Sequence, residues 1–261
     1  MTFDHASLEP DSRLVDDVYA SPNIGPRREG LKPAILILHY TGMKTAAAAI
    51  HYLALPSANV SCHYVIDEHG RVTQMVAERM RAWHAGVSHW KGIGDVNSAS
   101  IGIEIHNPGH DHGLPHFPAA QMRAVAALSR DIVERNRIAP EHVLAHSDVA
   151  PGRKIDPGET FDWAYLARQG VGHWVRPSPV DADDPGLDTG ARGAAVGEMQ
   201  ELLAAYGYGI EVTGAVDSHT RTVVAAFQRH FRQRRVDGRI DRSTLRTLQR
   251  LVAALPKSSL A

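Results

Sequence analysis

The stretch AILILH, residues 34–39, contains five apolar residues in succession and ends at a histidine. An apolar run of this length predicts a short buried strand. The same criteria predict strands at Val60–Asp67 and Arg71–Val76, which form a hairpin, and at Ser100–His106 and Val143–Ala145. Helical patterns are found at Thr45–Leu55 and Pro118–Arg135. Strands mixed with helices predict an α/β core, with helices packed on a central sheet.

The composition changes at Arg176–Gly186, where Pro and Asp dominate and apolar residues become rare. This change predicts a linker. Beyond it, Val212–Thr220 recurs in similar form as Val236–Thr244. In each copy a Gly supplies a turn, and an Asp and a Thr lie where a helix N-cap is expected. The tail is therefore predicted to be a small helical domain with two similar turn-helix units.

Charge and cysteine content exclude some classes of function. Lys and Arg number 28 and Asp and Glu number 29, so nothing suggests nucleic acid as a partner. Cys62 is the single cysteine, so no disulfide within the chain is expected. The N-terminus does not resemble a secretory signal, and no later run reaches membrane-spanning length. We therefore expect a cytoplasmic protein without a transmembrane segment, of unknown oligomeric state.

Three polar residues lie where strands end or where Pro and Gly shape the chain. His39 ends the first strand, His146 follows the strand Val143–Ala145, and Asp156 lies in the segment AHSDVAPGRKIDPGE (residues 145–159). That segment is poorly suited to helix or strand and is predicted to be a loop. Each histidine alone is explained by an ordinary strand-end hydrogen bond. Together, two imidazoles and one carboxylate with an open fourth position are typical of catalytic zinc, whereas closed structural sites usually contain thiolates.

The strand SIGIEIH, residues 100–106, contributes a candidate base. Its period of two places Ile101, Ile103 and Ile105 on one face and Gly102, Glu104 and His106 on the other. Glu104 on a partly covered face is expected to take a proton from water and pass it to a leaving amine, with His106 ranked second. Lys154 would face the same cavity as Asp156 and stabilise an oxyanion. These groups indicate metal-assisted hydrolysis.

Five stretches in this order resemble the zinc-dependent N-acetylmuramoyl-L-alanine amidases of the type 2 amidase family: LHYT (38–41), SCHYVI (61–66), AWHAG (82–86), SIGIEI (100–105) and AHSDVAPGRKIDPG (145–158). The resemblance implies Zn²⁺ bound by His39, His146 and Asp156, Glu104 as general base and Lys154 stabilising the transition state. It also implies a central mixed β-sheet flanked by helices. The expected reaction cuts the amide between the lactyl group of N-acetylmuramic acid and L-alanine, in peptidoglycan or muropeptides.

The resemblance also suggests substrate-side residues. Trp83 and His84 match the family's cleft segment and are expected to line the groove, with His63 nearby; a core Trp with a rim His is the plain alternative. The His-rich segment Asn107–His116 suggests either a second metal site or a flexible substrate-side loop, and we favour the loop, with Asn107 contacting substrate.

The tail resembles the type 1 peptidoglycan-binding domain, a three-helix module, through RGAAVGEMQELL (192–203), YGY (206–208), AFQ (226–228) and DGRIDRST (237–244). The resulting division is an arm at 1–22, an amidase domain at 23–175, a linker at 176–186 and a peptidoglycan-binding domain at 187–256. A wall-binding domain without an evident signal leaves two locations open. The substrate is a cytoplasmic turnover fragment, or the chain reaches the periplasm or cell wall by another route.

Two other functions fit parts of the pattern. A non-catalytic peptidoglycan-recognition protein on the same fold would be expected to lack a metal ligand or the base, and this chain has all of them. A zinc peptidase that cuts within the stem peptide would use similar chemistry on another bond.

Overall fold

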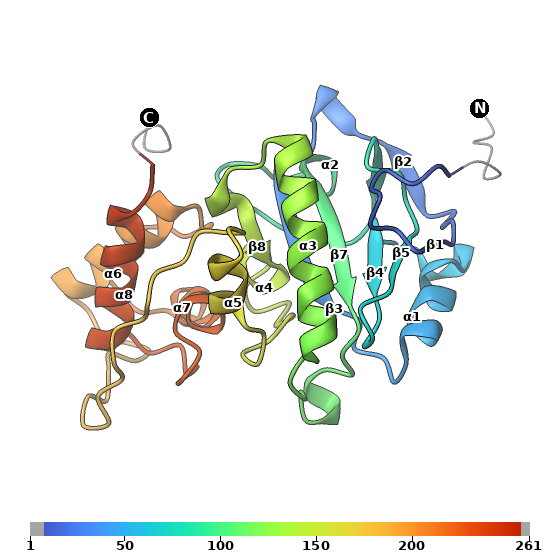
Figure 1. The fold of residues 1–261 in the computed structure, drawn as a ribbon. Helices are drawn as coiled ribbons and strands as arrows, with labels where there is room; N and C mark the ends of the chain where they lie inside the picture. The colour runs from blue at the N-terminus through green and yellow to red at the C-terminus, as the bar shows by residue number, and fades with distance from the viewer. Residues whose placement is uncertain (1–7, 257–261) are drawn as a thin grey trace.

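The computed structural model describes residues 8–256, so the first seven residues of the expected arm lie outside the described part. A six-stranded sheet in the order β1-β5-β4-β7-β3-β8 forms the centre of the first domain (Figure 1). Its strands are β1 (Asp17–Val18), β3 (Ile35–Tyr40), β4 (Tyr64–Ile66), β5 (Val72–Gln74), β7 (Ser100–Ile105) and β8 (Val143–Ala145). Only β4 and β5 pair antiparallel within it, so the sheet is mixed, as predicted. A separate antiparallel pair is formed by β2 (Ile24–Pro26) and β6 (Met80–Ala82).

The helices of this domain are α1 (Ala46–Leu53), α2 (Val96–Ala99), α3 (Ala119–Asn136), α4 (His146–Val149) and α5 (Trp163–Arg168), with short 3-10 turns at Arg28–Gly30, Pro56–Ala58, His110–His112 and Pro140–His142. The sequence predicts α1 and α3 to within two residues at each end. It misses α2, α4 and α5, because helices of four to six residues are too short to show helical periodicity. The segment 145–159 is therefore not all loop: it begins with one helical turn.

Two sheet details differ from the sequence prediction. The first strand of the hairpin is shorter than Val60–Asp67, because the backbone N–H groups of Met75 and Val76 both donate to the carbonyl of His63 and disturb the ladder there. The predicted irregular arm contributes the edge strand β1, which pairs parallel with β5. A two-residue exposed strand has no hydrophobic alternation by which it could have been recognised.

The two faces of the sheet have different roles. Leu36 and Leu38 of β3 pack with Ile101, Ile103 and Ile105 of β7 against the apolar side of α3. The next residues along the two strands, His39 and Glu104, are register partners on the opposite face. The predicted separation of the isoleucines from Glu104 is confirmed. One face thus packs under α3, and the opposite face carries Ile35 and Ile37 followed by His39 and its register partner Glu104 at the strand ends.

The second domain consists of α6 (Ala194–Tyr206), α7 (Ser218–Phe231) and α8 (Arg242–Ala253). The predicted half-repeat is confirmed by its caps: Asp217 accepts a hydrogen bond from the N–H of Thr220 at 2.7 Å, and Asp241 accepts one from Thr244 at 2.6 Å. Gln200 and Gln228 repeat as well, since each side chain binds the turn that precedes the next helix. The small three-helix domain is as expected.

The two domains share one hydrophobic core. Ile35 and Ile37 of β3 belong to the same buried cluster as Leu203, Phe227 and Leu248 of the three helices. The linker 176–186 contains no helix or strand. It is held against α8, where the backbone N–H of Ser178 donates to Thr247 Oγ1 at 3.0 Å. The second domain is therefore packed onto the first rather than tethered to it (Figure 1).

Within residues 8–256, no helix has both the length and the apolar character needed to cross a membrane.

A buried carboxylate joins the end of α3 to the sheet. Glu78 accepts hydrogen bonds from Tyr64 Oη at 2.7 Å, from both terminal nitrogens of Arg135 at 2.7 and 2.8 Å, and from Asn136 at 3.0 Å. Burial would raise the pKa of Glu78, but the hydrogen bonds from Arg135, Asn136 and Tyr64 outweigh it and hold the pKa below its usual value. The ionised carboxylate therefore stabilises the fold.

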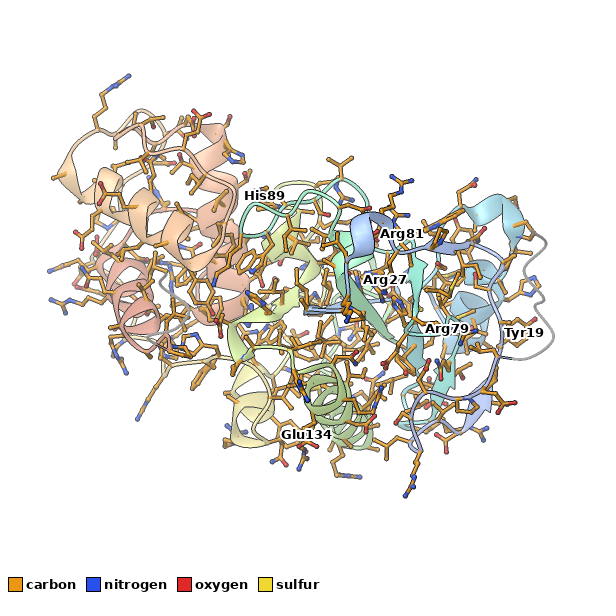
Figure 2. All side chains as sticks on the ribbon, turned by 90° about the horizontal axis from the view of Figure 1, so that it is seen from above. Tyr19, Arg27, Arg79, Arg81, His89 and Glu134 are labelled. Atoms are coloured by element: carbon orange, nitrogen blue, oxygen red, sulfur yellow. The ribbon has the colours of Figure 1, made fainter. Side chains whose placement is uncertain are left out.

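We predict that Glu78→Gln lowers the free energy of unfolding by about 2 kcal/mol at neutral pH, because Arg135 loses its buried partner. The pKa of Glu78 is lower in the folded state, so its contribution is present above the unfolded pKa of about 4.3 and is lost as pH falls through the folded pKa. Urea denaturation at several pH values measures this. The control is Glu134→Gln, at an exposed position of α3 (Figure 2). Equal stabilities of the two variants at neutral pH would contradict the prediction.

Candidate active site

Three buried side chains converge at the end of β3. His39 Nδ1 lies 2.9 Å from His146 Nδ1 and 3.1 Å from Asp156 Oδ2, and the last two atoms are 3.0 Å apart. A tetrahedral ion bound at about 2.0–2.2 Å from each ligand would hold such atoms about 3.3 Å apart. The residues predicted as ligands from the sequence therefore meet in a geometry that fits a metal ion. Among residues 8–256, this is the single group of three or more His, Cys, Asp and Glu side chains close enough to share an ion.

The sheet and the following loop produce this convergence. β3 and β8 are parallel neighbours with Leu38 opposite Ala145, so His39 and His146 leave the same edge of the sheet side by side. His146 is the first residue of α4, and the chain then turns back to bring Asp156 to the same point. The N–H of Ser147 donates to the carbonyl of Asp156 at 3.1 Å and closes this loop.

Hydrogen bonds assign the protonation of both imidazoles. His39 Nε2 lies 2.9 Å from His84 Nδ1, and His84 Nε2 lies 3.2 Å from Ser100 Oγ, whose hydroxyl donates to the carbonyl of Val96. His39 Nε2–H is thus the donor to His84, and Nδ1 of His39 is left with its lone pair toward the cluster. His146 Nε2 donates in the same way to the carbonyl of Ala85 at 3.2 Å.

Electrostatics favour the same protonation states. Burial and the neighbouring His146 lower the pKa of His39 to about 4, so the ring is neutral at physiological pH. Burial acts to raise the pKa of Asp156, but His146 and His39 outweigh it and hold the pKa well below its usual value. Two imidazoles and one carboxylate are the donor set of a divalent cation with an open position.

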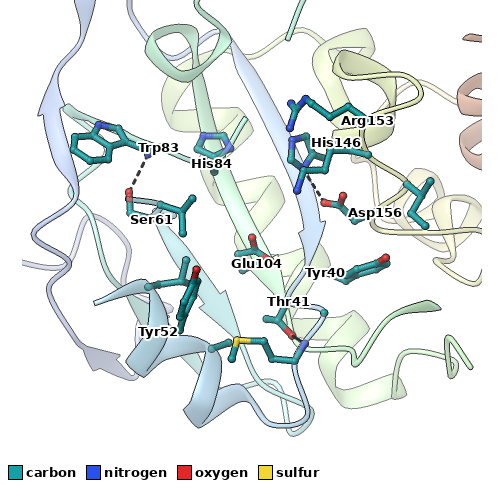
Figure 3. A pocket seen from close by; sticks show the side chains of 17 residues that line it. Tyr40, Thr41, Tyr52, Ser61, Trp83, His84, Glu104, His146, Arg153 and Asp156 are labelled. Carbon is teal, nitrogen blue, oxygen red and sulfur yellow. Dashed lines mark hydrogen bonds and ion pairs between the residues drawn. The ribbon is translucent and has the colours of Figure 1, made fainter. Parts of the chain in front are cut away.

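Glu104 lies beside the cluster in a cavity of about 440 Å³ (Figure 3). The cavity is also lined by His146, Asp156, Lys154, Trp83 and His84. Burial and the negative charge of Asp156 raise the pKa of Glu104 well above its usual value, although Lys154 opposes this shift. Oε2 of Glu104 has no hydrogen-bond partner among the described residues. A carboxylate with a raised pKa and an unused oxygen is suited to exchange protons with a molecule in the cavity.

His106, the alternative base, is placed less well than Glu104. Its Nδ1 lies 3.3 Å from Thr41 Oγ1 and its Nε2 lies 3.9 Å from Glu68, and it is not among the residues that line the cavity. The ranking of Glu104 first agrees with this placement. Lys154 and Asp156 line the same cavity, as expected.

The proposed substrate-side residues separate into two groups. Trp83 and His84 line the cavity, as the sequence predicts. His63 is fully buried behind it, where Nδ1 accepts from the N–H of Gly102 at 3.0 Å; burial and Arg27 lower the pKa of His63 to about 3. Asn107 is also buried, and its amide donates to the carbonyl of Pro115 at 2.8 Å. Neither His63 nor Asn107 is a lining residue of this cavity, and each is hydrogen-bonded to backbone groups instead.

The segment Asn107–His116 is more fixed than the sequence suggests. His110 lies between Tyr40 Oη, at 3.1 Å from Nδ1, and Glu159, at 3.1 Å from Nε2. Tyr40 itself lines the cavity. Each ring nitrogen of His110 thus has a protein partner, and the described part of the chain shows no second metal cluster. These two hydrogen bonds give the His110 ring a fixed position, contrary to the expectation of an imidazole without fixed geometry. Its partners lie too far away in the sequence to be predicted.

Arg153 is a site residue that sequence reasoning missed. It lines the cavity, and its guanidinium donates to the carbonyls of Ala85 and Val87, at 2.7 Å from Nη2 to Val87. It therefore holds the segment next to Trp83 and His84 in place.

Family models were compared with the chain. A model described as N-acetylmuramoyl-L-alanine amidase matches residues 29–159, half of the chain. The chain belongs to this family. A second model, described as a putative peptidoglycan binding domain, matches residues 192–248. The resemblance predicted from the sequence is confirmed for both domains.

Individual relatives support the same family assignment. The chain is 40% identical to the N-acetylmuramoyl-L-alanine amidase AmiD of Escherichia coli (strain K12) over 185 residues, which covers 67% of this chain and 64%, slightly under two thirds, of that protein. A solved complex of Escherichia coli AmiD with anhydro-N-acetylmuramic acid-L-Ala-D-gamma-Glu-L-Lys matches with a TM-score of 0.72 and 34% identity, covering 89% of this chain and 93% of the other. AMPDH3 of Pseudomonas aeruginosa in complex with anhydromuramic pentapeptide matches with a TM-score of 0.69 and 29% identity, covering 91% and 96%.

We predict that Gly102→Ala weakens metal binding, because a Cβ at this position would lie 2.6 Å from His84 Nδ1 and displace the ring that orients His39. Loss of such an outer contact is expected to reduce the affinity for Co²⁺, used as a spectroscopic probe, by about tenfold or more. Titration followed by visible absorption measures the affinity. Gly94→Ala is the matched control, since a Cβ there meets nothing within 4 Å. Wild-type affinity in Gly102→Ala would contradict the role of His84.

Proposed function

We propose that this chain is a zinc-dependent N-acetylmuramoyl-L-alanine amidase. In this reaction water cleaves the amide between the lactyl carbonyl of N-acetylmuramic acid and the nitrogen of L-alanine, giving a free lactyl carboxylate and a peptide with a free amine. The observation that carries the proposal is the placement of Glu104 in the same cavity as His146 and Asp156, two members of the three-residue cluster. Family membership supports the choice of the bond.

Zn²⁺ is the cofactor that we assign to His39, His146 and Asp156. Two imidazoles and one carboxylate, with room for a fourth ligand, are the protein ligands of many hydrolytic zinc sites. When bound there, zinc would polarise the scissile carbonyl and make water acidic enough to attack at neutral pH. The neutral His39 ring and the ionised Asp156 are already in the protonation states that such binding requires.

The protein groups account for the proton transfers. Glu104, in its ionised form, accepts a proton from the attacking water and then delivers it to the alanine nitrogen as the C–N bond breaks. Burial and Asp156 raise its pKa above the usual value, which suits a residue that serves as base and then as acid. Lys154 lines the same cavity and opposes the negative charge that develops on the carbonyl oxygen.

The substrate class that we propose is peptidoglycan or its muropeptide fragments. Two relatives were solved with anhydromuramyl peptides, and both match about nine tenths or more of this chain. Tyr52 and Trp83 line the cavity and supply flat apolar surfaces for such a ligand. The second domain is proposed to bind peptidoglycan as its family model indicates. The location of the protein, in the cytoplasm or in the cell envelope, stays a prediction.

A non-catalytic recognition protein is the second candidate. It shares the fold but does not require a base or an oxyanion partner beside the metal ligands. Glu104 and Lys154, which line the cavity here, favour the enzyme. A zinc peptidase would release fragments of the stem peptide instead of the intact stem.

We predict that the purified protein converts intact and anhydro-muropeptides to an intact stem peptide and a free muramyl sugar, as identified by mass spectrometry. Glu104→Gln is expected to retain one equivalent of zinc and to lose turnover by at least about a hundredfold, because the proton acceptor is removed. His146→Ala is expected to lose both zinc and turnover.

Zinc content by elemental analysis and product masses are measured on the same preparations. Cleavage within the stem would contradict the amidase in favour of a peptidase. Binding of muropeptides without any cleavage, with zinc present, would support the recognition protein. Full turnover in Glu104→Gln would exclude Glu104 as the base.

A further inference from the structure

A buried carboxylate connects the helical domain to the metal-binding cluster. Asp148 lies in α4, two residues after His146, and its side chain is completely buried. Its Oδ1 accepts a hydrogen bond from Tyr208 Oη at 2.6 Å. Its Oδ2 lies 2.6 Å from His230 Nδ1 and accepts from the backbone N–H of Ala145 at 2.8 Å. Tyr208 and His230 belong to the second domain, whereas Ala145 is the last residue of β8.

The partners of Asp148 are themselves firmly held. The His230 ring stacks on Trp163, with ring centroids 3.7 Å apart, and on Phe231 at 3.8 Å. The ring of Tyr208 packs edge-on against Trp90 at 5.0 Å. Both Tyr208 and His230 are only 2% exposed. The two donors are therefore fixed by packing before they meet the carboxylate.

The second domain also covers the loop between His146 and Asp156, the two candidate metal ligands that follow β8. α4 lies against α7, and Thr222 of α7 sits so close to Gly152 that a Cβ there would lie 3.2 Å from it (Figure 1). Farther along, Gln233 donates to the carbonyl of Phe161 at 2.7 Å. At the other end of α4, the N–H of His89 donates to the carbonyl of Val149 at 2.8 Å.

We propose that the helical domain is part of the metal centre: Tyr208 and His230 act through Asp148 as positioning residues for His146. A helix of one turn is not stable alone, so the orientation of α4 must come from its tertiary contacts. The carboxylate of Asp148 lies two residues from His146 and links the start of α4 to the second domain. This inference rests on the proposed function only in that His146 is taken as a zinc ligand.

The energetics favour a tight coupling. A buried carboxylate that loses one hydrogen-bond donor is left with an uncompensated lone pair, which is costly away from solvent. Without the hydroxyl of Tyr208, α4 can recover a partner for Asp148 only by moving, and His146 moves with it. The helical domain, which matches the peptidoglycan-binding family model, would then also determine how tightly the catalytic metal is held.

The test compares Tyr208→Phe with Tyr206→Phe in the full-length chain. Tyr206 is the matched control, because it is equally buried and belongs to the same aromatic cluster, but its hydroxyl bonds to His173 Nδ1 at 3.1 Å and not to Asp148. We expect Tyr208→Phe to weaken Zn²⁺ binding, measured against a chromophoric chelator, by about tenfold, the lower end of the range for outer contacts of metal ligands. Tyr206→Phe is expected to stay within about twofold of wild type.

A spectroscopic readout separates positioning from simple destabilisation. The visible absorption bands of the Co²⁺-substituted protein report ligand geometry and are expected to shift in Tyr208→Phe and not in Tyr206→Phe, even where both lower the unfolding temperature equally. Asp148→Asn provides a second variant of the same size. Its amide cannot accept from Tyr208, Ala145 and His230 together, so it should weaken Zn²⁺ binding at least as much as Tyr208→Phe.

Equal zinc affinities and unchanged Co²⁺ spectra in Tyr208→Phe and Asp148→Asn would overturn the inference while leaving the amidase proposal intact. Equal losses in Tyr208→Phe and Tyr206→Phe would also overturn it, because the effect would then come from general packing. A wild-type chain that binds no Zn²⁺ would instead overturn the metal assignment itself, and this inference with it.

Discussion

The structure depends on one constraint: three polar side chains are buried together, and each needs a partner. The imidazoles of His39 and His146 and the carboxylate of Asp156 bring three lone-pair donors to within 3.1 Å of one another. Grouped donors of this kind, removed from water, are stable when they share a cation. The three side chains are brought together by the parallel pairing of β3 with β8 and by the loop that closes after α4.

The same constraint explains how the sheet is used. Alternation along β3 sends Leu36 and Leu38 to the core under α3 and His39 to the open face, and the next strand places Glu104 beside it. The site is therefore built on rigid strand ends, with its protonation states assigned by outer contacts such as His84 and Ala85. These outer contacts extend into the second domain through Asp148, which bonds to Tyr208 and His230. The packing of the two domains therefore supports the side chains of the cavity.

Much of this arrangement could be predicted from the sequence. The apolar runs and the period of two along residues 100–106 were enough to predict an α/β core and the face of Glu104. The mixed sheet and the assignment of all three ligands, Asp156 in its loop included, followed from the resemblance to the family. The half-repeat in the tail predicted its helix caps. These features depend on local patterns, or on residue types that have few other uses in such positions.

Other features depend on contacts between distant residues and could not be predicted. The helical turn α4 is too short to show periodicity, and His110 is held by Tyr40 and Glu159, which lie far from it in the sequence. The link from Asp148 to Tyr208 and His230 crosses 60 and 82 residues. For the same reason the expected substrate residues His63 and Asn107 could not be distinguished from residues that support the backbone behind the cavity.

The central claim is that His39, His146 and Asp156 hold one catalytic zinc ion. Anomalous X-ray diffraction at the zinc absorption edge, from crystals of the full chain, tests this directly. We expect a single strong peak bonded to Nδ1 of both histidines and to Oδ2 of Asp156, with Glu104 and Lys154 facing its open side. A zinc peak held by other residues, such as the histidines of the segment 107–116, or no peak in crystals of active protein, would contradict it.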